Sequence, residues 1–284
     1  MSEDRKVKRI SQSQPTMEGA GVRLKRAFGS VDPLLDPFLL LDDFHSENPD
    51  DYLAGFPWHP HRGIETITYM LHGKVEHQDS LGNKGVITPG DAQWMTAGSG
   101  IIHSEMPKQE NGLLWGFQLW ANLPAAHKMS EPQYRDIEAK DIPEIKPVDG
   151  VRLKIVCGMV DGVSGPVTDV ITEPEYLDIS LAPGAVYEHP VPHGRNLFAY
   201  VTEGTVAFGE DRSDSVAREH LAVFGPGDKV VLSADETARL LLISGAPIGD
   251  PVAWGGPIVM NTREELETAF REYNEGTFLK HKTD

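Results

Sequence analysis

The sequence predicts an all-β fold with two domains and a short helix near its end. Glycine and proline occur about every ten residues, with alternating apolar and polar residues between them, which is typical of antiparallel sandwiches and barrels. The length of 284 residues corresponds to two domains of roughly 150 residues each. A weak internal repeat indicates the same division.

Individual elements follow from local patterns. Residues 64–70 (IETITYM) alternate as a strand does, and so do residues 177–181 (LDISL), which a Pro-Gly turn follows. Near the end of the chain, Thr262 and Glu265 have the spacing of a capping box. Apolar side chains at helical spacing come next: Leu266, Ala269, Phe270 and Tyr273. We therefore expect strands throughout and one helix after residue 262.

Two short patterns occur twice in the same order. Tyr-x-x-x-Gly-x-Val begins at residue 69 and again at residue 200, and Pro-Gly-Asp begins at residue 89 and again at residue 226. The similar separations indicate a duplicated β domain. The charged, proline-containing residues 130–150 are the predicted linker. We expect the domains to span residues 1–135 and 136–284.

Two histidine motifs predict a metal site in the first domain. His59-Pro60-His61 and His103-Ser104-Glu105 both resemble strand segments, in which residues two apart point to the same face. On neighbouring strands they would place three imidazoles and one carboxylate around one point. Such a donor set suits redox-active first-row metals. A structural zinc site would use cysteines, and the chain has one cysteine.

Spacing alone leaves two candidates for the carboxylate ligand. Glu105 belongs to the second motif. Glu65 lies four residues after His61, so a continuous strand would place both on the same face. Glu65 would then be either the ligand itself or an acceptor that orients a ligating imidazole.

The second half of the chain lacks these ligands. Projected through the repeat, the four residues fall on Pro190, Pro192, Leu240 and Leu242. We therefore expect metal in the first domain only, and we interpret His189 and His193 as surface or loop residues.

Large apolar side chains flank the two motifs: Phe56, Trp58, Trp94, Met95, Trp115, Phe117 and Trp120. Most side chains of this kind pack in cores. Their density beside a metal nevertheless favours a pocket for a flat, apolar molecule.

Charge and composition exclude several classes of partner. The net charge of −17 argues against nucleic-acid binding, which depends on lysine and arginine at the phosphates, and the short basic segments 5–9 and 23–26 are interpreted as solvated surface. The polar N-terminus lacks the apolar core of a signal peptide, and no run reaches the ~18 apolar residues of a membrane span. We expect a monomer in the cytoplasm or nucleus, without nucleic-acid or membrane partners.

Six stretches make the chain similar to the pirin family of the cupin superfamily: residues 36–40 (DPFLL), 56–66 (FPWHPHRGIET), 89–98 (PGDAQWMTAG), 101–107 (IIHSEMP), 131–134 (EPQY) and 259–262 (VMNT). The resemblance implies a bicupin of two antiparallel β-barrel, or jelly-roll, domains. It implies His59, His61, His103 and Glu105 as ligands, and so favours Glu105 over Glu65. The metal implied is Fe²⁺, with Ni, Cu, Mn, Co and Zn as other divalent candidates.

The resemblance also implies two kinds of function. Many pirins resemble quercetin 2,3-dioxygenases, which open the flavonol ring with O₂ and release carbon monoxide; Glu105 would be the catalytic base for the flavonol hydroxyl. Animal pirins are instead described as iron-dependent, redox-sensing transcriptional co-regulators that act through protein partners. An enzyme acting on another aromatic or enol-like metabolite is a third hypothesis.

Overall fold

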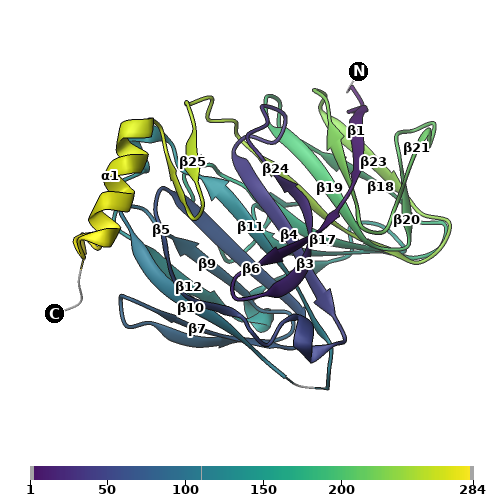
Figure 1. The fold of residues 1–284 in the computed structure, drawn as a ribbon. Coiled ribbons are helices and arrows are strands. Elements are labelled where there is room, and N and C mark those ends of the chain that lie inside the picture. Colours follow the sequence, from purple (N-terminus) through teal and green to yellow (C-terminus); the bar gives the residue numbers. More distant parts are fainter. Residues whose placement is uncertain (1–2, 110, 282–284) are drawn as a thin grey trace. The chain divides into compact units, whose positions relative to one another are not determined.

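The computed structural model describes residues 3–109 and 111–281 (Figure 1). The chain forms two compact units, each built from segments far apart in the sequence. The larger unit comprises Gln14–Val31, Phe38–Ala139 and Ile248–Asp284, and the smaller unit comprises Met1–Ser13, Asp32–Pro37 and Lys140–Pro247. These units differ from the predicted domains, residues 1–135 and 136–284, at both chain ends. The first strand pairs within the smaller unit and the C-terminal helix packs in the larger one.

The larger unit contains two antiparallel sheets. The seven-stranded sheet has the order β12 (Gln133–Ile137), β9 (Ala92–Thr96), β6 (Ile64–His72), β11 (Leu114–Asn122), β4 (Phe38–Ser46), β3 (Val22–Gly29) and β2 (Gln14–Glu18). The four-stranded sheet has the order β5 (Phe56–His61), β10 (Ile101–Lys108), β7 (Lys74–Asp79) and β8 (Lys84–Ile87). Leu24 and Met70 of the first sheet share a hydrophobic cluster with Val75 and Ile87 of the second. The sheets therefore pack face to face.

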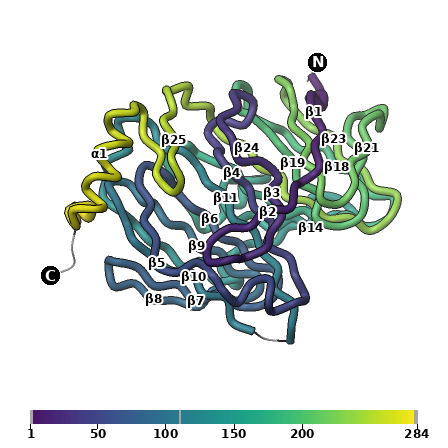
Figure 2. The backbone as a smooth tube through the Cα atoms, viewed as in Figure 1, coloured from purple at the N-terminus to yellow at the C-terminus, as the bar shows by residue number. Residues whose placement is uncertain are grey.

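The smaller unit has the same two sheets. The seven-stranded one has the order β1 (Val7–Gln12), β22 (His220–Phe224), β19 (Asn196–Glu203), β24 (Ala238–Gly245), β17 (Glu175–Leu181), β14 (Val151–Cys157) and β13 (Glu144–Ile145). The four-stranded one has the order β18 (Val186–Pro190), β23 (Lys229–Ser233), β20 (Thr205–Phe208) and β21 (Asp214–Ala217). Figure 2 shows the purple N-terminal strand β1 among the green strands of this unit.

Short elements complete the chain. These are the hairpin β15 (Met159–Val160) and β16 (Val163–Ser164), the hairpin β25 (Ala253–Gly255) and β26 (Ile258–Met260), the helix α1 (Arg263–Asn274), and the 3₁₀ turns η1 (Pro49–Asp51), η2 (Ala125–His127) and η3 (Ala139–Asp141). The predicted linker, residues 130–150, contains β12, η3 and β13, and the crossing between units follows Ala139. Within the described residues, no helix has the length and apolarity to cross a membrane.

The common strand order confirms the predicted duplication. Counted across the sheets, β6 corresponds to β19, β7 to β20, β5 to β18 and β10 to β23. The turn between β6 and β7 contains Gly73 at φ 78°, and the turn between β19 and β20 contains Gly204 at φ 66°. Both lie in the left-handed region that favours glycine. The Tyr-x-x-x-Gly-x-Val repeat therefore marks equivalent hairpins.

Strand register corrects the projected ligand positions. His59 lies opposite His103 in the β5–β10 pair, and His189 lies opposite Val230 in the β18–β23 pair. His189 therefore takes the place of His59, and Val230 that of His103. The projection onto Leu240 failed because the first Pro-Gly-Asp precedes β9 and the second precedes β23, which are not equivalent strands. By the same registers, Val191 replaces His61 and Leu232 replaces Glu105.

The interior of the smaller unit is apolar at three of these four positions. Val191, Val230 and Leu232 belong to one buried hydrophobic cluster. His189 is 1% exposed, so its interpretation as a surface residue was wrong. Its ring nitrogens bond to Glu175 Oε2 at 2.8 Å and to the Tyr187 hydroxyl at 3.2 Å. His189 is thus a satisfied core histidine, whereas the His193 side chain is exposed, as predicted.

Two buried basic side chains, Arg62 and Lys128, fix the C-terminal segment to the rest of the larger unit. Arg62, 2% exposed, donates to Ser99 O at 2.7 Å and to Phe278 O at 2.8 Å, and pairs with Glu272 at 2.8 Å. Lys128 Nζ donates to the carbonyl oxygens of residues 63 and 259, both at 2.9 Å. The predicted helix is present as α1, with the complete capping box of Thr262 and Glu265. The segment therefore holds a fixed position beside β5.

We predict that Arg62→Met destabilises the larger unit by about 3–5 kcal/mol, because it leaves buried carbonyl acceptors unpaired and removes one of the two cations that pair with Glu272, the other being Lys280. Urea unfolding measures the loss, and hydrogen exchange of residues 263–279 reports whether α1 detaches. Arg263→Met is the control, since its pair with Glu267 is exposed and should be worth less than about 1 kcal/mol. Equal effects of the two substitutions would contradict the role given to Arg62.

Candidate metal centre

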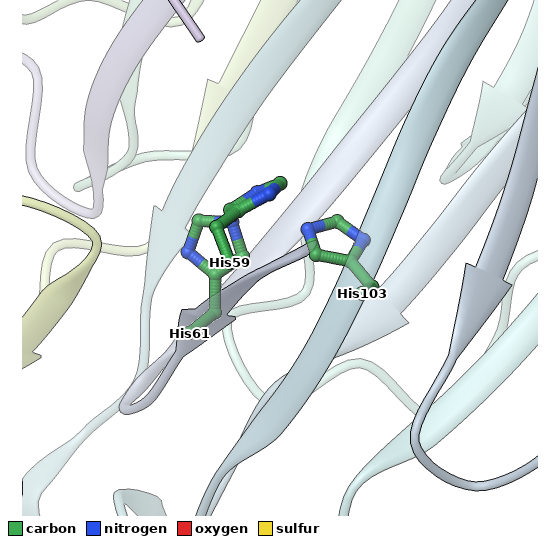
Figure 3. Close-up of side chains that lie close together, drawn as sticks. All are labelled: His59, His61 and His103. Carbon is green, nitrogen blue, oxygen red and sulfur yellow. The ribbon is translucent and has the colours of Figure 1, made fainter. Parts of the chain in front are cut away.

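Three histidine rings converge at the β5–β10 pair. His59 and His61 lie on β5 and His103 on β10, and their side chains point toward one another (Figure 3). The ring centroids of His103 and His59 are 4.3 Å apart, and those of His103 and His61 are 4.9 Å apart. One potential ligand atom from each ring lies within 4.8 Å of the other two. The structure thus brings together the three histidines that the sequence predicted.

Two carbonyl groups determine the tautomers of the β5 rings. His59 Nδ1 lies 2.8 Å from Pro57 O, and His61 Nδ1 lies 3.0 Å from Pro257 O. A carbonyl oxygen can only accept, so both Nδ1 atoms carry hydrogen. Burial and then the neighbouring His59 lower the pKa of His61 to about 3. The His61 ring is therefore neutral, and its Nε2 has a free lone pair.

The two Nε2 atoms are spaced as metal ligands are. They lie 3.1 Å apart, and in the neutral tautomers no hydrogen stands between them. Two nitrogens at about 2.0–2.1 Å from one ion and at a right angle to each other are ~3 Å apart. A shared cation therefore fits this pair and removes the repulsion between the lone pairs.

His103 completes the argument for a cation. The ring is fully buried, and neither nitrogen has a hydrogen-bond partner among the described residues. Burial and then His61 hold the pKa of His103 well below its usual value. Leaving both nitrogens of a buried imidazole unsatisfied is costly. A metal ion bound to one of the His103 nitrogens would reduce this cost. Neutral imidazoles together with one carboxylate form a donor set that suits first-row metals.

Glu105 lies on β10 and belongs to a group with His77 and His103, which shares only His103 with the first group, whereas Glu65 lies apart from both. Glu105 is buried, and its Oε1 accepts from the Thr68 hydroxyl at 3.1 Å. Glu65 accepts from Thr96 at 2.8 Å and belongs to neither group of candidate ligands among the described residues. The same-face argument for Glu65 was wrong because β5 ends at His61 and a new strand, β6, begins after a glycine turn.

A second group of candidate ligands contains a residue that sequence reasoning missed. His77, His103 and Glu105 also have ligand atoms within 4.8 Å of one another. His77 lies on β7 directly opposite Glu105 on β10. The signal was present as His-x-Asp at residues 77–79, with the spacing of the other two motifs. Its meaning depended on knowing that β7 pairs with β10.

The site opens into a cavity of about 560 Å³. His59, His61 and Glu105 form part of its wall, and Trp120 packs edge-on against His61 with ring centroids 5.0 Å apart. Trp58 lines the cavity while 54% of its surface stays exposed. The volume lies in the range of small-molecule pockets.

The predicted aromatic wall was confirmed for three residues of seven. Phe56, Trp58 and Trp120 line the cavity. The other four are buried core side chains outside its lining: Trp94, Met95, Trp115 and Phe117. Trp254 lines the cavity too, and it was missed because the C-terminal segment that carries it was assigned to the other domain.

Two family models match the chain: Pirin over residues 21–121 and the Pirin C-terminal cupin domain over residues 176–279. A pirin-like protein of Caulobacter vibrioides is 47% identical over 276 residues, which cover 96% of this chain and 99% of that protein.

The chain belongs to the pirin family.

Other pirin relatives carry enzyme names. A Pseudomonas aeruginosa protein named "Putative quercetin 2,3-dioxygenase" is 44% identical over 281 residues, which cover 97% of this pirin and 99% of that protein. The crystal structure of quercetin 2,3-dioxygenase from Acinetobacter baumannii matches with a TM-score of 0.90 at 34% identity, covering 97% of this pirin and 98% of that chain. The predicted bicupin fold is thereby confirmed.

A metal-bound pirin is also similar to this one. The structure of a bacterial pirin from Escherichia coli in complex with nickel(II) has a TM-score of 0.65 and 25% identity, and the match covers 84% of this chain and 99% of that chain.

Proposed function

We propose that this pirin binds one iron(II) ion through His59, His61, His103 and Glu105, and uses it to cleave flavonols as a quercetin 2,3-dioxygenase does. One observation carries the proposal: the imidazole nitrogens of three histidines converge, and two of these histidines, His59 and His61, form part of the wall of an aromatic-lined cavity. The names of the Pseudomonas aeruginosa and Acinetobacter baumannii relatives support the substrate class.

A bound divalent ion would supply Lewis acidity and a fixed template for the reactants. The chain's own residues supply the rest. Trp58, Trp120 and Trp254 give the cavity aromatic surfaces for a planar substrate. Leu24 and Phe44 add apolar side chains to the lining, which would limit the water around the reacting ring.

Glu105 is the residue placed to move a proton. Thr68 donates to Oε1, which holds the carboxylate in one orientation and leaves Oε2 to accept the proton of the flavonol hydroxyl. Thr68 also contacts the Gln118 side-chain amide at 2.7 Å. In the structure the oxygen at this contact is Gln118 Oε1; because one hydroxyl hydrogen cannot serve two acceptors, donation from Thr68 to Glu105 requires the Gln118 amide to be turned so that its nitrogen faces Thr68. Both partners line the cavity, so the orientation of Glu105 is set beside the substrate.

We predict one iron per chain, held in the larger unit. Iron content after anaerobic loading and dialysis should be near one equivalent for the wild type and near zero for His61→Ala. His193→Ala should keep a full equivalent, because that side chain is exposed in the smaller unit. A second equivalent that survives His61→Ala would show a site elsewhere.

We predict that Glu105→Ala loses most of the metal and that Glu65→Gln keeps it. Glu105 would be a ligand, whereas glutamine at position 65 can still accept from Thr96. Metal titration under the same conditions for both variants makes the comparison. The reverse order of affinities would assign the ligand role to Glu65.

We predict that the iron-loaded protein consumes quercetin in air and releases carbon monoxide. Loss of flavonol absorbance should require both O₂ and iron, and it should disappear in His103→Ala. Quercetin that stays unchanged with a full equivalent of bound iron would refute the dioxygenase. A redox-sensing regulator would then be the better hypothesis, to be tested by the effect of iron oxidation on binding of a protein partner.

A further inference from the structure

The strand β7 lies on the far side of β10 from the histidines of β5. The sheet order β5-β10-β7 places β10 in the middle. On β7, His77 lies opposite Glu105, and Asp79 lies opposite His103. Alternate residues of β7 are buried, and these two belong to the buried set. The two pairs, His-x-Asp on β7 and His-x-Glu on β10, thus face the same interior.

His77 is held rigidly but has one free nitrogen. Its ring is fully buried and stacks on Tyr134, with centroids 4.7 Å apart and planes inclined by 28°. Nε2 lies 3.5 Å from Asp79 Oδ2, and Nδ1 has no partner among the described residues. Asp79 is fixed in turn, because it accepts from the backbone N–H groups of Leu81 at 2.9 Å and Asn83 at 3.0 Å.

We propose that His77 is a positioning residue for the metal ligand His103, an inference that rests on the proposed metal centre. The Asp79 carboxylate can only accept, so it places the His77 hydrogen on Nε2 and leaves Nδ1 as an acceptor. That nitrogen takes the hydrogen of the His103 nitrogen that faces away from the site. The other His103 nitrogen, turned toward His59 and His61 in Figure 3, keeps its lone pair for the metal.

Geometry and chemistry both support this chain of hydrogen bonds from Asp79 through His77 to His103, which we call the relay. The rings of His77 and His103 have centroids 5.2 Å apart, and ligand atoms of the two rings lie within 4.8 Å of each other. His77 Nδ1 and both nitrogens of His103 have no hydrogen-bond partner among the described residues, so each is available for the proposed bond or for the metal. Ligating histidines commonly donate their second N–H to such a partner, which fixes the tautomer and the ring orientation.

The smaller unit provides an internal comparison. On its equivalent strand β20, Phe208 lies opposite Leu232, just as His77 lies opposite Glu105. Phe208 is fully buried in the apolar cluster that also contains Val230 and Leu232. The unit that lacks His103 and Glu105 therefore lacks His77 as well. A histidine that served packing alone would have no reason to be absent together with the ligands.

The test is a cobalt(II) titration of metal-free His77→Phe, which copies the smaller unit and preserves the stack on Tyr134. The dissociation constant, from competition with a chelating dye, should rise about 10–100-fold, with one equivalent still bound and shifted cobalt absorption bands. His72→Phe is the control, since that exposed ring stacks on Trp115, and it should bind as the wild type does.

Asp79→Asn tests the direction of the hydrogen bonds and remains informative if His77→Phe fails to fold. The asparagine amide would donate to His77 Nε2 and force the hydrogen onto Nδ1, which then opposes the His103 hydrogen. We expect a similar loss of cobalt affinity, and no additional loss in the double variant, because both substitutions break one relay.

Three results would overturn the proposal: wild-type affinity and spectrum in His77→Phe, additive losses in the double variant, or complete loss of cobalt from His77→Phe, which would make His77 a ligand. A wild-type protein that binds no cobalt would instead refute the metal centre itself.

Discussion

Four imidazole rings lie close together in the larger unit: those of His61, His77 and His103 are buried, and that of His59 is half-buried. Burial disfavours the charged form of His61 and His103 and lowers the pKa of both. Two backbone carbonyls then fix the hydrogens of His59 and His61 on Nδ1. The remaining nitrogens converge without hydrogens between them. A bound cation would satisfy these nitrogens, and the proposed metal centre therefore accounts for their arrangement.

The C-terminal segment helps to orient these imidazole rings. Pro257 supplies the carbonyl that orients His61, although 196 residues separate the two. Trp254 and Pro257 also line the cavity. Arg62, adjacent to His61, holds the same segment through Phe278 and Glu272. The end of the chain therefore returns to the larger unit, where it orients one proposed metal ligand and completes the pocket wall.

The smaller unit shows which side chains stand at the equivalent positions where the proposed ligands are absent. In the smaller unit, one apolar cluster fills the interior with Val191, Val230 and Leu232 where His61, His103 and Glu105 stand in the larger one. His189 survives at the His59 position only because Glu175 and Tyr187 satisfy its nitrogens. These apolar side chains are buried without hydrogen-bond partners, whereas each of the polar groups that they replace would need one.

Much of this could be predicted from the sequence because the relevant signals are local. Strand alternation predicted the fold class, and the repeated pattern that contains Gly73 and Gly204 predicted the duplication. The capping box at Thr262 predicted the helix. The histidine motifs gave the three converging rings. What failed depended on pairing between distant strands: the Leu240 projection, the buried state of His189 and the face of Glu65. His77 and Trp254 were missed for the same reason. The register of β7 against β10 brings His77 to the site, and the return of the C-terminal segment to the larger unit brings Trp254 there.

Anomalous diffraction from crystals of the iron-loaded protein, measured on both sides of the iron absorption edge, tests the central claim most directly. The account predicts a single peak per chain, bounded by the Nε2 atoms of His59 and His61, one nitrogen of His103 and the Glu105 carboxylate. A peak in the smaller unit, or one ligated by His77 in place of the β5 histidines, would contradict it.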